Sequence, residues 1–226
     1  GHPGAWGWVH GGMGAVSRSL ADCARAAGAE IRDSASVKRV VVRGGRAEGV
    51  ELMNGSVLRA RQVVSCAHPT TTYLDLVGAE HLPPDFVTDV ARYKYRGSSG
   101  KVNLALDGLP DFRALPGPGR HLRGAISISP SIDYMERAYD DAKYGRFSRR
   151  PYIDIVIPSL TDPTVAPPGK HVMSCFVQYA PYDLRDGSWD EQREAFGDTV
   201  IDAICEHAPN LRERILHRQV VTPLDL

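Results

Sequence analysis

Apolar residues near the start of the chain recur at helical spacing. They fall every three to four positions from residue 16 to residue 27, which predicts a helix that opens at residues 11–14 and ends at Gly28. One face of this helix is expected to be core, and it carries Val16, Leu20, Ala24 and Ala27. The glycines at its start leave backbone N–H groups open to a ligand, because no side chain shields them and the helix dipole is positive there. A tight loop without a ligand explains the same glycines equally well.

The stretch from residue 28 to residue 69 organises the first half of the chain. It holds three short β-branched runs separated by Gly44-Gly45 and Asn54-Gly55, and Asn-Gly favours a type I′ hairpin turn. A three-stranded β-meander is therefore predicted. Its last limb, residues 62–66, is expected to run on into a larger sheet, and Pro69 ends the strand pairing.

Two short helices and a link are predicted next. Thr70 is expected to cap a helix over residues 70–77, and a second helix is expected from residue 82 to about Tyr93. Residues 94–100 form a polar, glycine-containing link. We place a domain boundary there, so that the two predicted domains are residues 1–96 and 97–226.

The second half of the chain alternates apolar and polar positions in short runs, which predicts a mainly antiparallel sheet with one face against helices. The expected strands are residues 101–106, 125–128, 152–157, 171–180 and 215–221. One expected helix begins at a serine cap, Ser131. Another begins at the capping box from Ser188 to Glu191, and its apolar positions are Phe196, Val200, Ile204 and Ala208. The predicted fold class is α+β or α/β.

Composition narrows the function classes. The 226 residues include 27 basic and 27 acidic side chains, so the zero net charge gives no support to nucleic-acid binding. No apolar run approaches the roughly 18 residues that a membrane helix needs, and the first residues do not resemble a signal peptide. The four cysteines stand far apart, at positions 23, 66, 175 and 205. This spacing favours free, buried thiols in a reducing compartment, and we expect a cytoplasmic protein.

No metal site or acid–base pair is predicted. The eight histidines include no pair at i, i+3 or i+4 spacing. Asp140 and Asp141 are neighbours on an expected helix and point about 100° apart, so we expect them to be solvated rather than to act together on one substrate. The glycines at residues 11–14 lack the preceding strand and the third glycine of a dinucleotide fingerprint. No catalytic residue is assigned.

Residues 176–182 read Phe-Val-Gln-Tyr-Ala-Pro-Tyr. A strand of this kind, closed by proline, suits the wall of an apolar cavity that holds a few orienting hydrogen-bonding groups. Gln178 and Tyr179 are the candidates for contact with a substrate. The same residues also suit core packing next to a sheet edge.

Taken together, these segments resemble the FAD-dependent amine oxidases and phytoene desaturases. The shared order is an amphipathic helix, Gly-Ala-Glu-Ile, a Val-x-x-Val strand, a glycine-rich turn, an Asn-Gly turn and Val-Val-Ser-x-Ala-x-Pro. Further runs are similar to the phytoene-dehydrogenase-related proteins described as pyridine nucleotide-disulphide oxidoreductase domain-containing. These runs are residues 4–7 with 11–15, 103–107, 162–164 with 166–169, 178–182 and 222–226. The resemblance covers essentially the whole chain.

The resemblance implies a parent enzyme that uses FAD and removes a hydride from a hydrophobic small molecule. It places Gly11, Gly12 and Met13 beside the flavin, Ala15 near the substrate, and adenine on the backbone N–H and C=O of Val37. Without the resemblance, Val37 is simply a strand residue. The first domain would be part of a split, Rossmann-like FAD-binding domain that contains the β-meander, and the second would bind the substrate.

Two glycine-rich segments that hold FAD in the family do not occur in this chain. One is the N-terminal strand and glycine turn for the pyrophosphate, and the other lies under the isoalloxazine. We therefore expect an internal fragment with an incomplete FAD site, inactive by itself. The alternative is a non-catalytic module that binds a lipid-like ligand or a protein partner. Unpaired strand edges and an apolar interdomain face are expected to promote homo-oligomers.

Overall fold

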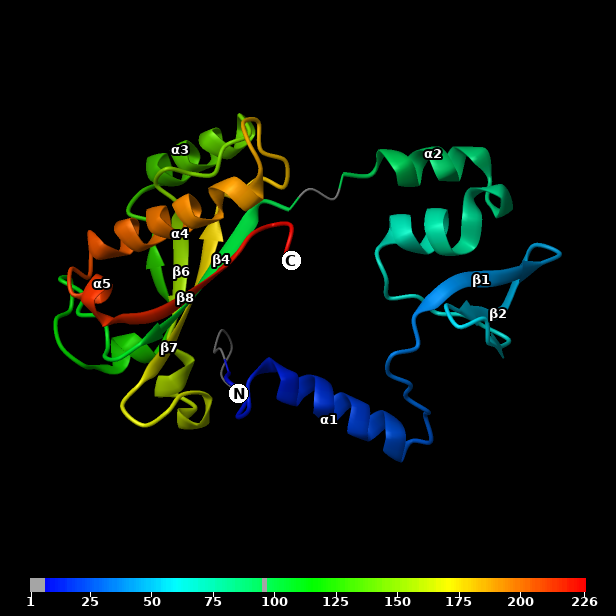
Figure 1. The fold of residues 1–226 in the computed structure, drawn as a ribbon, viewed down its shortest axis with the longest axis horizontal. Coiled ribbons are helices and arrows are strands. Elements are labelled where there is room, and N and C mark those ends of the chain that lie inside the picture. Colours follow the sequence, from blue (N-terminus) through cyan, green and yellow to red (C-terminus); the bar gives the residue numbers. More distant parts are fainter. Residues whose placement is uncertain (1–6, 95–96) are drawn as a thin grey trace. The chain divides into compact units, whose positions relative to one another are not determined.

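The computed structural model describes residues 7–94 and 97–226 (Figure 1). Within these ranges the chain divides into two compact units. The larger unit comprises residues 7–20 and 97–226, and the smaller unit comprises residues 21–94. The predicted domains, 1–96 and 97–226, differ from these units in the placement of residues 7–20, and that division stays a prediction.

The first helix, α1 (Met13–Ala26), lies where the periodicity predicts it. Gly28 follows with a φ of 89°, the left-handed conformation expected of a C′ glycine. The prediction of a buried face is wrong for the described chain, because no residue of α1 is buried and Leu20 is 67% exposed. Periodicity predicts an amphipathic helix, but it does not supply the surface that would cover the apolar side.

The smaller unit contains the predicted β-meander. Its strands are β1 (Val37–Arg43), β2 (Arg46–Leu52) and β3 (Val57–Arg59), paired antiparallel in the order β1-β2-β3. The connecting turns contain Gly44, Gly45 and Gly55, all with positive φ. The predicted last limb is wrong: the third strand is β3, and residues 62–66 form no strand. The β-branched run is present, but no described strand pairs with it, and Val64 is 87% exposed.

Helical segments complete the smaller unit. They are the π-helix η1 (Thr71–Gly78), the 3₁₀ turn η2 (Ala79–His81) and α2 (Pro84–Arg92). Helix α2 matches its prediction, with Pro84 in the first turn. Thr70 does not cap η1 with its side chain, because its own backbone is already helical. Tyr73 and Phe86 meet edge to face at 4.9 Å and join η1 to α2.

The larger unit is built on a five-stranded antiparallel sheet, and all five predicted strands are confirmed. The spatial order is β5-β6-β7-β4-β8, and the strands run side by side in Figure 1. Every neighbouring pair is antiparallel. The bounds are β4 (Ser99–Leu106), β5 (Ile126–Ile128), β6 (Tyr152–Val156), β7 (His171–Gln178) and β8 (Ile215–Val221).

Three α-helices and three 3₁₀ turns accompany this sheet. They are α3 (Ile132–Lys143), α4 (Trp189–Cys205), α5 (Leu211–Arg214), η3 (Arg120–Arg123), η4 (Pro158–Leu160) and η5 (Pro163–Val165). Ser131 caps α3 by accepting the Tyr134 N–H, and the predicted capping box of α4 is formed in full. The apolar positions predicted for this helix are all buried.

The two faces of the larger sheet differ. Side chains on one face form the core together with α4, and Val102, Ile155 and Cys175 on three adjacent strands are fully buried there. Side chains on the opposite face are only partly buried or are exposed. We call this opposite face the open face and define it by Lys101, Asn103, Ser127, Tyr152, Asp154, Ser174, Phe176, Gln178 and Gln219, which alternate with the core positions along their strands.

Candidate functional site

The predicted flavin-facing residues form a tight turn before α1. Gly11 and Gly12 have φ values of 81° and 72°, which side chains disfavour. The Gly12 N–H donates to the Val9 carbonyl at 3.0 Å, and the Ala15 N–H donates to the Gly12 carbonyl at 3.0 Å. We call residues 9–15 the glycine turn. It brings Gly11, Gly12, Met13 and Ala15 together at one helix end.

The surface of the glycine turn is accessible. A Cβ placed on Gly12 would meet no atom within 4 Å, and the Met13 side chain is 73% exposed. Glycine therefore serves the backbone conformation here and also leaves room for a group to approach the backbone closely. This geometry fits a flat ligand that lies against the turn, as the flavin prediction requires. The roles of these residues stay predictions.

Asp162, from the loop between η4 and η5, holds the glycine turn. Its Oδ2 accepts the Gly11 N–H at 2.7 Å, across 151 positions of sequence. Its Oδ1 accepts both the Thr164 N–H at 3.0 Å and the Thr164 hydroxyl at 2.6 Å. The exposed His10 ring lies 3.4 Å away. These donors, first the Thr164 hydroxyl and then the Gly11 N–H, hold the pKa of Asp162 well below its usual range.

Asp162 was missed as a site residue by the sequence reasoning. The run Asp-Pro-Thr is one of the runs that resemble the family, and its physical signal is that the aspartate side chain bonds the backbone two residues on. That signal predicts a local turn and says nothing about Gly11. Only the tertiary structure shows that this carboxylate, 5% exposed, reaches a residue near the other end of the chain.

Val37 belongs to the smaller unit and stands at the start of β1. In the described sheet β1 is an edge strand, so alternate backbone N–H and C=O groups along it face away from β2 and have no partner among the described strands. Val37 is 37% exposed. An edge strand fits the predicted backbone recognition of adenine, which needs main-chain groups rather than a side chain. This assignment stays a prediction.

Gln178 and Tyr179 are adjacent but have different surroundings. Gln178 ends β7 on the open face, opposite Tyr152 and Ser99 in the neighbouring strands. Tyr179 packs edge to face on Tyr139 of α3, with ring centroids 5.2 Å apart, and its backbone is fixed by Ser148. No described contact joins either residue to the glycine turn. Their substrate roles stay predictions.

The open face carries two hydrogen-bonded rows of polar side chains. In one row, Asp154 accepts the hydroxyls of Tyr152, at 2.6 Å, and Ser127. The bond to Asp154 raises the pKa of Tyr152. In the other row, the Ser174 hydroxyl donates to Asn103, whose amide donates to Gln219 at 3.1 Å. The face can therefore orient a ligand through fixed polar groups that sequence reasoning did not identify as a set.

Hollows also occur elsewhere on the larger unit, and two of them are lined by residues considered in the sequence analysis. One, of about 850 Å³, lies along α3 and includes Asp140 and Asp141. The other, of about 420 Å³, lies beside β5 and includes His121 and His207. Neither hollow is lined by Ala15, Gln178 or Tyr179.

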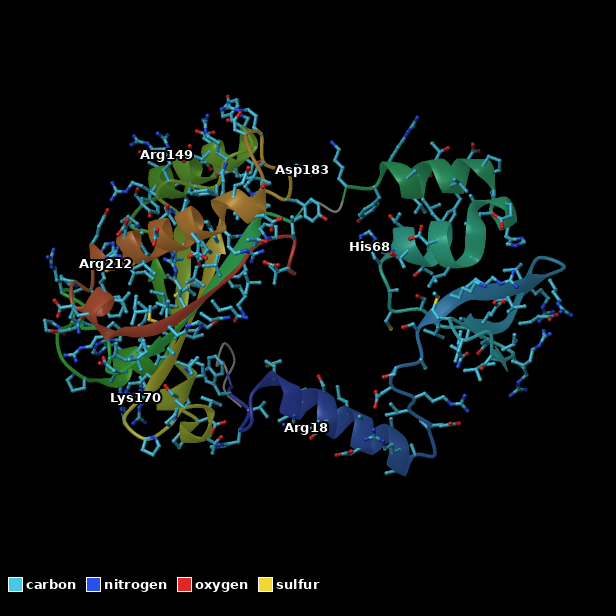
Figure 2. All side chains as sticks on the ribbon, viewed as in Figure 1. Arg18, His68, Arg149, Lys170, Asp183 and Arg212 are labelled. Carbon is cyan, nitrogen blue, oxygen red and sulfur yellow. The ribbon has the colours of Figure 1, made fainter. Side chains whose placement is uncertain are left out.

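Asp141 is not solvated as predicted. It is 7% exposed and accepts the backbone N–H of Arg149 at 3.1 Å and its Nε at 3.2 Å. Arg149 is labelled in Figure 2. The Arg149 side chain is itself exposed, and both residues line the hollow along α3, so the buried Asp141 carboxylate fixes the segment after the helix at the surface. Asp140 remains exposed, as predicted.

The four cysteines differ in burial. All four cysteines are free, but only Cys175 is buried, whereas Cys23 and Cys66 are exposed. Burial raises the pKa of the Cys175 thiol to about 12.

Among the described residues, no three His, Cys, Asp or Glu side chains lie close enough together to form a metal site. No helix in the described ranges combines the length and apolar character needed to cross a membrane.

The described chain is an α+β protein of two units. The larger unit carries the glycine turn and a sheet with a polar open face, and the smaller unit carries a β-meander in which β1 is an edge strand. Comparison of the sequence with known protein families identifies the class of protein. The family described as flavin containing amine oxidoreductase matches residues 3–209, and the chain belongs to that family. The family resemblance expected from the sequence is thereby confirmed.

Curated relatives agree with this family. The chain is 41% identical over its full length to pyridine nucleotide-disulfide oxidoreductase domain-containing protein 2 of Mus musculus, and it covers 40% of that protein. It is 29% identical to a neurosporene-forming phytoene desaturase of Cereibacter sphaeroides, over 94% of this chain and 40% of the relative. The chain thus spans about two fifths of the length of these relatives.

Solved structures confirm the fold. An oxidoreductase from Methanosarcina mazei aligns over 93% of this chain and 42% of its own length, with a TM-score of 0.65 and 21% identity. A protein from Pyrococcus furiosus aligns over 93% of this chain and 43% of its own length, with a TM-score of 0.60 and 17% identity. These matches and the antiparallel sheets bear out the predicted fold class.

Proposed function

We propose that this chain is a section of an FAD-dependent oxidoreductase that removes a hydride from a hydrophobic substrate. The reaction would desaturate a C–C bond or oxidise a C–N or C–O bond. The observation that carries the proposal is the family match over residues 3–209, which spans both units. The relatives support an apolar substrate class, because their names specify phytoene, zeta-carotene and prolycopene.

In this proposal the chain contributes positioning rather than acid–base chemistry. Bound FAD would supply the hydride acceptor. Gly11, Gly12 and Met13 would border the flavin, Val37 would hold adenine through its backbone, and Ala15 would face the substrate. Gln178 and Tyr179 would orient the substrate and help to exclude water. Hydride transfer to a cofactor does not require a charged catalytic pair on the protein, so the catalytic residues stay unassigned.

The deciding experiment is to express the full-length parent gene and to record its absorption spectrum. We expect a yellow protein whose flavin bands bleach when it is mixed anaerobically with its hydrophobic substrate. A colourless parent that gains no flavin bands from added FAD would contradict the proposal. It would favour the alternative, a ligand-binding or protein-binding module that has lost redox chemistry.

A second measurement concerns the isolated 226 residues. We expect them to bind free FAD poorly and to be inactive, because the glycine-rich segments that hold the pyrophosphate and the isoalloxazine in the family do not occur in this sequence. A titration that shows sub-micromolar affinity, with a flavin spectrum, would contradict the incomplete FAD site.

The proposal also includes homo-oligomer formation, a cytoplasmic location and the lack of a nucleic-acid partner. The meander leaves two strand edges unpaired within its own sheet, which favours homo-oligomers. Light scattering that shows a clean monomer would count against this. A cytoplasmic location and the lack of a nucleic-acid partner stay predictions from composition.

A further inference from the structure

The loop that carries Asp162 is itself fixed to the sheet. The Ser159 hydroxyl, 3.1 Å from His171 Nδ1, also accepts the Val172 N–H at 3.2 Å, which ties η4 to the start of β7. The Asp162 N–H then donates to the Pro158 carbonyl at 2.8 Å. The carboxylate is therefore presented from a platform that the sheet holds in place.

The two carboxylate oxygens have separate partners. Oδ1 is taken by Thr164, which fixes the rotation of the carboxylate, and Oδ2 is left for the Gly11 N–H. Both positions receive donors, so an ionised carboxylate, which only accepts, suits them both. An asparagine in its place would turn an NH₂ group toward one of these donors. In one orientation the NH₂ group faces the Gly11 N–H and that bond is lost. In the other it faces the Thr164 N–H, so the bond to Gly11 is weakened because its acceptor is uncharged and no longer held in place.

We propose that Asp162 is a positioning residue that fixes the glycine turn in the orientation from which it contacts the flavin. The inference rests on the flavin role proposed above for Gly11, Gly12 and Met13. Because residues 11 and 12 are both glycine, the turn has many alternative conformations open to it, and the bond to Asp162 favours the one with positive φ at both positions. The loop between η4 and η5 would thus set the geometry of the cofactor side of the site.

The first arm of the test measures the contact itself in the 226-residue chain. Hydrogen exchange of the Gly11 amide is followed by NMR in the wild type and in Asp162→Asn. We expect exchange at Gly11 to become about tenfold faster or more, the size expected when a hydrogen bond to a charged group is lost. Unchanged exchange at Gly11 would overturn the proposal.

Asp111→Asn is the matched control for this arm. Asp111 also accepts a backbone N–H, that of Gly117 at 2.7 Å, in a loop of the same unit, and it makes no described contact with the glycine turn. The Asp111→Asn variant should leave the Gly11 exchange rate unchanged.

If Asp162→Asn fails to fold, Thr164→Val serves instead, because it removes one of the bonds that fix the carboxylate and leaves Gly11 untouched. It should give a smaller acceleration in the same direction.

The second arm uses the full-length parent with its flavin. We expect Asp162→Asn to raise the FAD dissociation constant about tenfold and to shift the flavin spectrum and the midpoint potential, with Asp111→Asn unchanged. Faster Gly11 exchange without any change in FAD affinity, spectrum or potential would make the contact merely structural and would overturn the proposal. A colourless wild-type parent would overturn the proposed function and with it this role of Asp162. A yellow parent whose FAD affinity, spectrum and potential are the same in wild type and Asp162→Asn would overturn only the role of Asp162.

Discussion

Asp141 and Asp162 are both carboxylates that the fold draws out of solvent. Each accepts a backbone N–H from a residue that the local sequence pattern does not connect with it: Arg149 for Asp141 and Gly11 for Asp162. Buried carboxylates of this kind are stabilised by the donors around them rather than by exposure to water. Their burial is therefore a property of the tertiary structure.

The lowered pKa of Asp162 predicts a pH dependence. In the unfolded chain this carboxyl takes up a proton near pH 3.9, whereas in the folded chain it stays ionised at lower pH. Its contribution to stability is therefore fully present above about pH 5 and is lost as the pH falls through its folded pKa. We expect the difference in unfolding free energy between wild type and Asp162→Asn to be constant from about pH 7 to 5 and to shrink below about pH 4.

Urea unfolding at a series of pH values measures this difference. Asp111→Asn again serves as the control, since no donor cluster surrounds its carboxylate in the described structure. A difference that stays constant down to about pH 3 would show that the Asp162 charge is not what stabilises the loop.

Phe196 is expected to be a major contributor to the stability of the larger unit. Its side chain is fully buried and meets the rings of Trp189 and Phe147, each with ring centroids 5.5 Å away. Phe196→Ala should lower the free energy of unfolding by about 3–5 kcal/mol, through lost burial and a cavity. Phe176→Ala, on the open face with 39% exposure, should cost about 1 kcal/mol or less. Urea denaturation compares the two, and equal losses would contradict this assignment of the core.

The structure contains the predicted helices and strands whose apolar spacing and capping residues all lie within the element itself. Strand β8 has the predicted bounds, and α4 begins at the predicted capping box. The predictions fail where an element depends on packing or strand pairing with another part of the chain. Residues 62–66 have strand composition without a described partner strand, and α1 has an apolar face without a described covering surface.

The capping box of α4 gives a prediction for a single helix end. The Ser188 hydroxyl accepts the Glu191 N–H, and the Glu191 carboxylate accepts the Ser188 N–H at 2.9 Å. Ser188→Ala should lower the free energy of unfolding by about 1 kcal/mol, because one helix N–H loses its acceptor. Thermal unfolding followed by circular dichroism measures the loss. Ser17→Ala, on the exposed surface of α1, is the matched control and should leave the free energy of unfolding nearly unchanged. If Ser188→Ala also leaves it unchanged, the cap does not stabilise the fold.

The two units are expected to unfold at different denaturant concentrations. The larger unit has one extended core, whereas the buried hydrophobic residues of the smaller unit are Val40, Leu52 and Val90 among the described positions. A unit that buries less apolar surface opens at lower free energy. We expect peptides from β1 and β2 to lose hydrogen-exchange protection at lower urea than peptides from β4 and β7. Loss of protection in both units at the same urea concentration would contradict two independent units.

The candidate site was predicted only in part. The tight turn at Gly11 and Gly12 was predicted because a glycine pair before an amphipathic helix is a local signal, and the positive φ values agree with a turn. The place of these glycines beside a flavin is implied by the family resemblance and stays a prediction. The rows on the open face were not identified, because Asn103, Ser174 and Gln219 stand far apart in sequence and meet only through strand pairing. The Asp162 contact was missed for the same reason.

The sequence by itself determined most of the helices and strands and the glycine turns between them, because periodicity, capping residues and turn residues act over a few neighbouring positions. Its motifs also indicated the family, through their resemblance to known members. The tertiary structure decided which apolar faces are covered, which sheet face stays open and which carboxylate meets the glycine turn. These outcomes depend on contacts between residues as far apart as Gly11 and Asp162. The energy of such a contact exists only when the whole fold brings its partners within hydrogen-bonding distance.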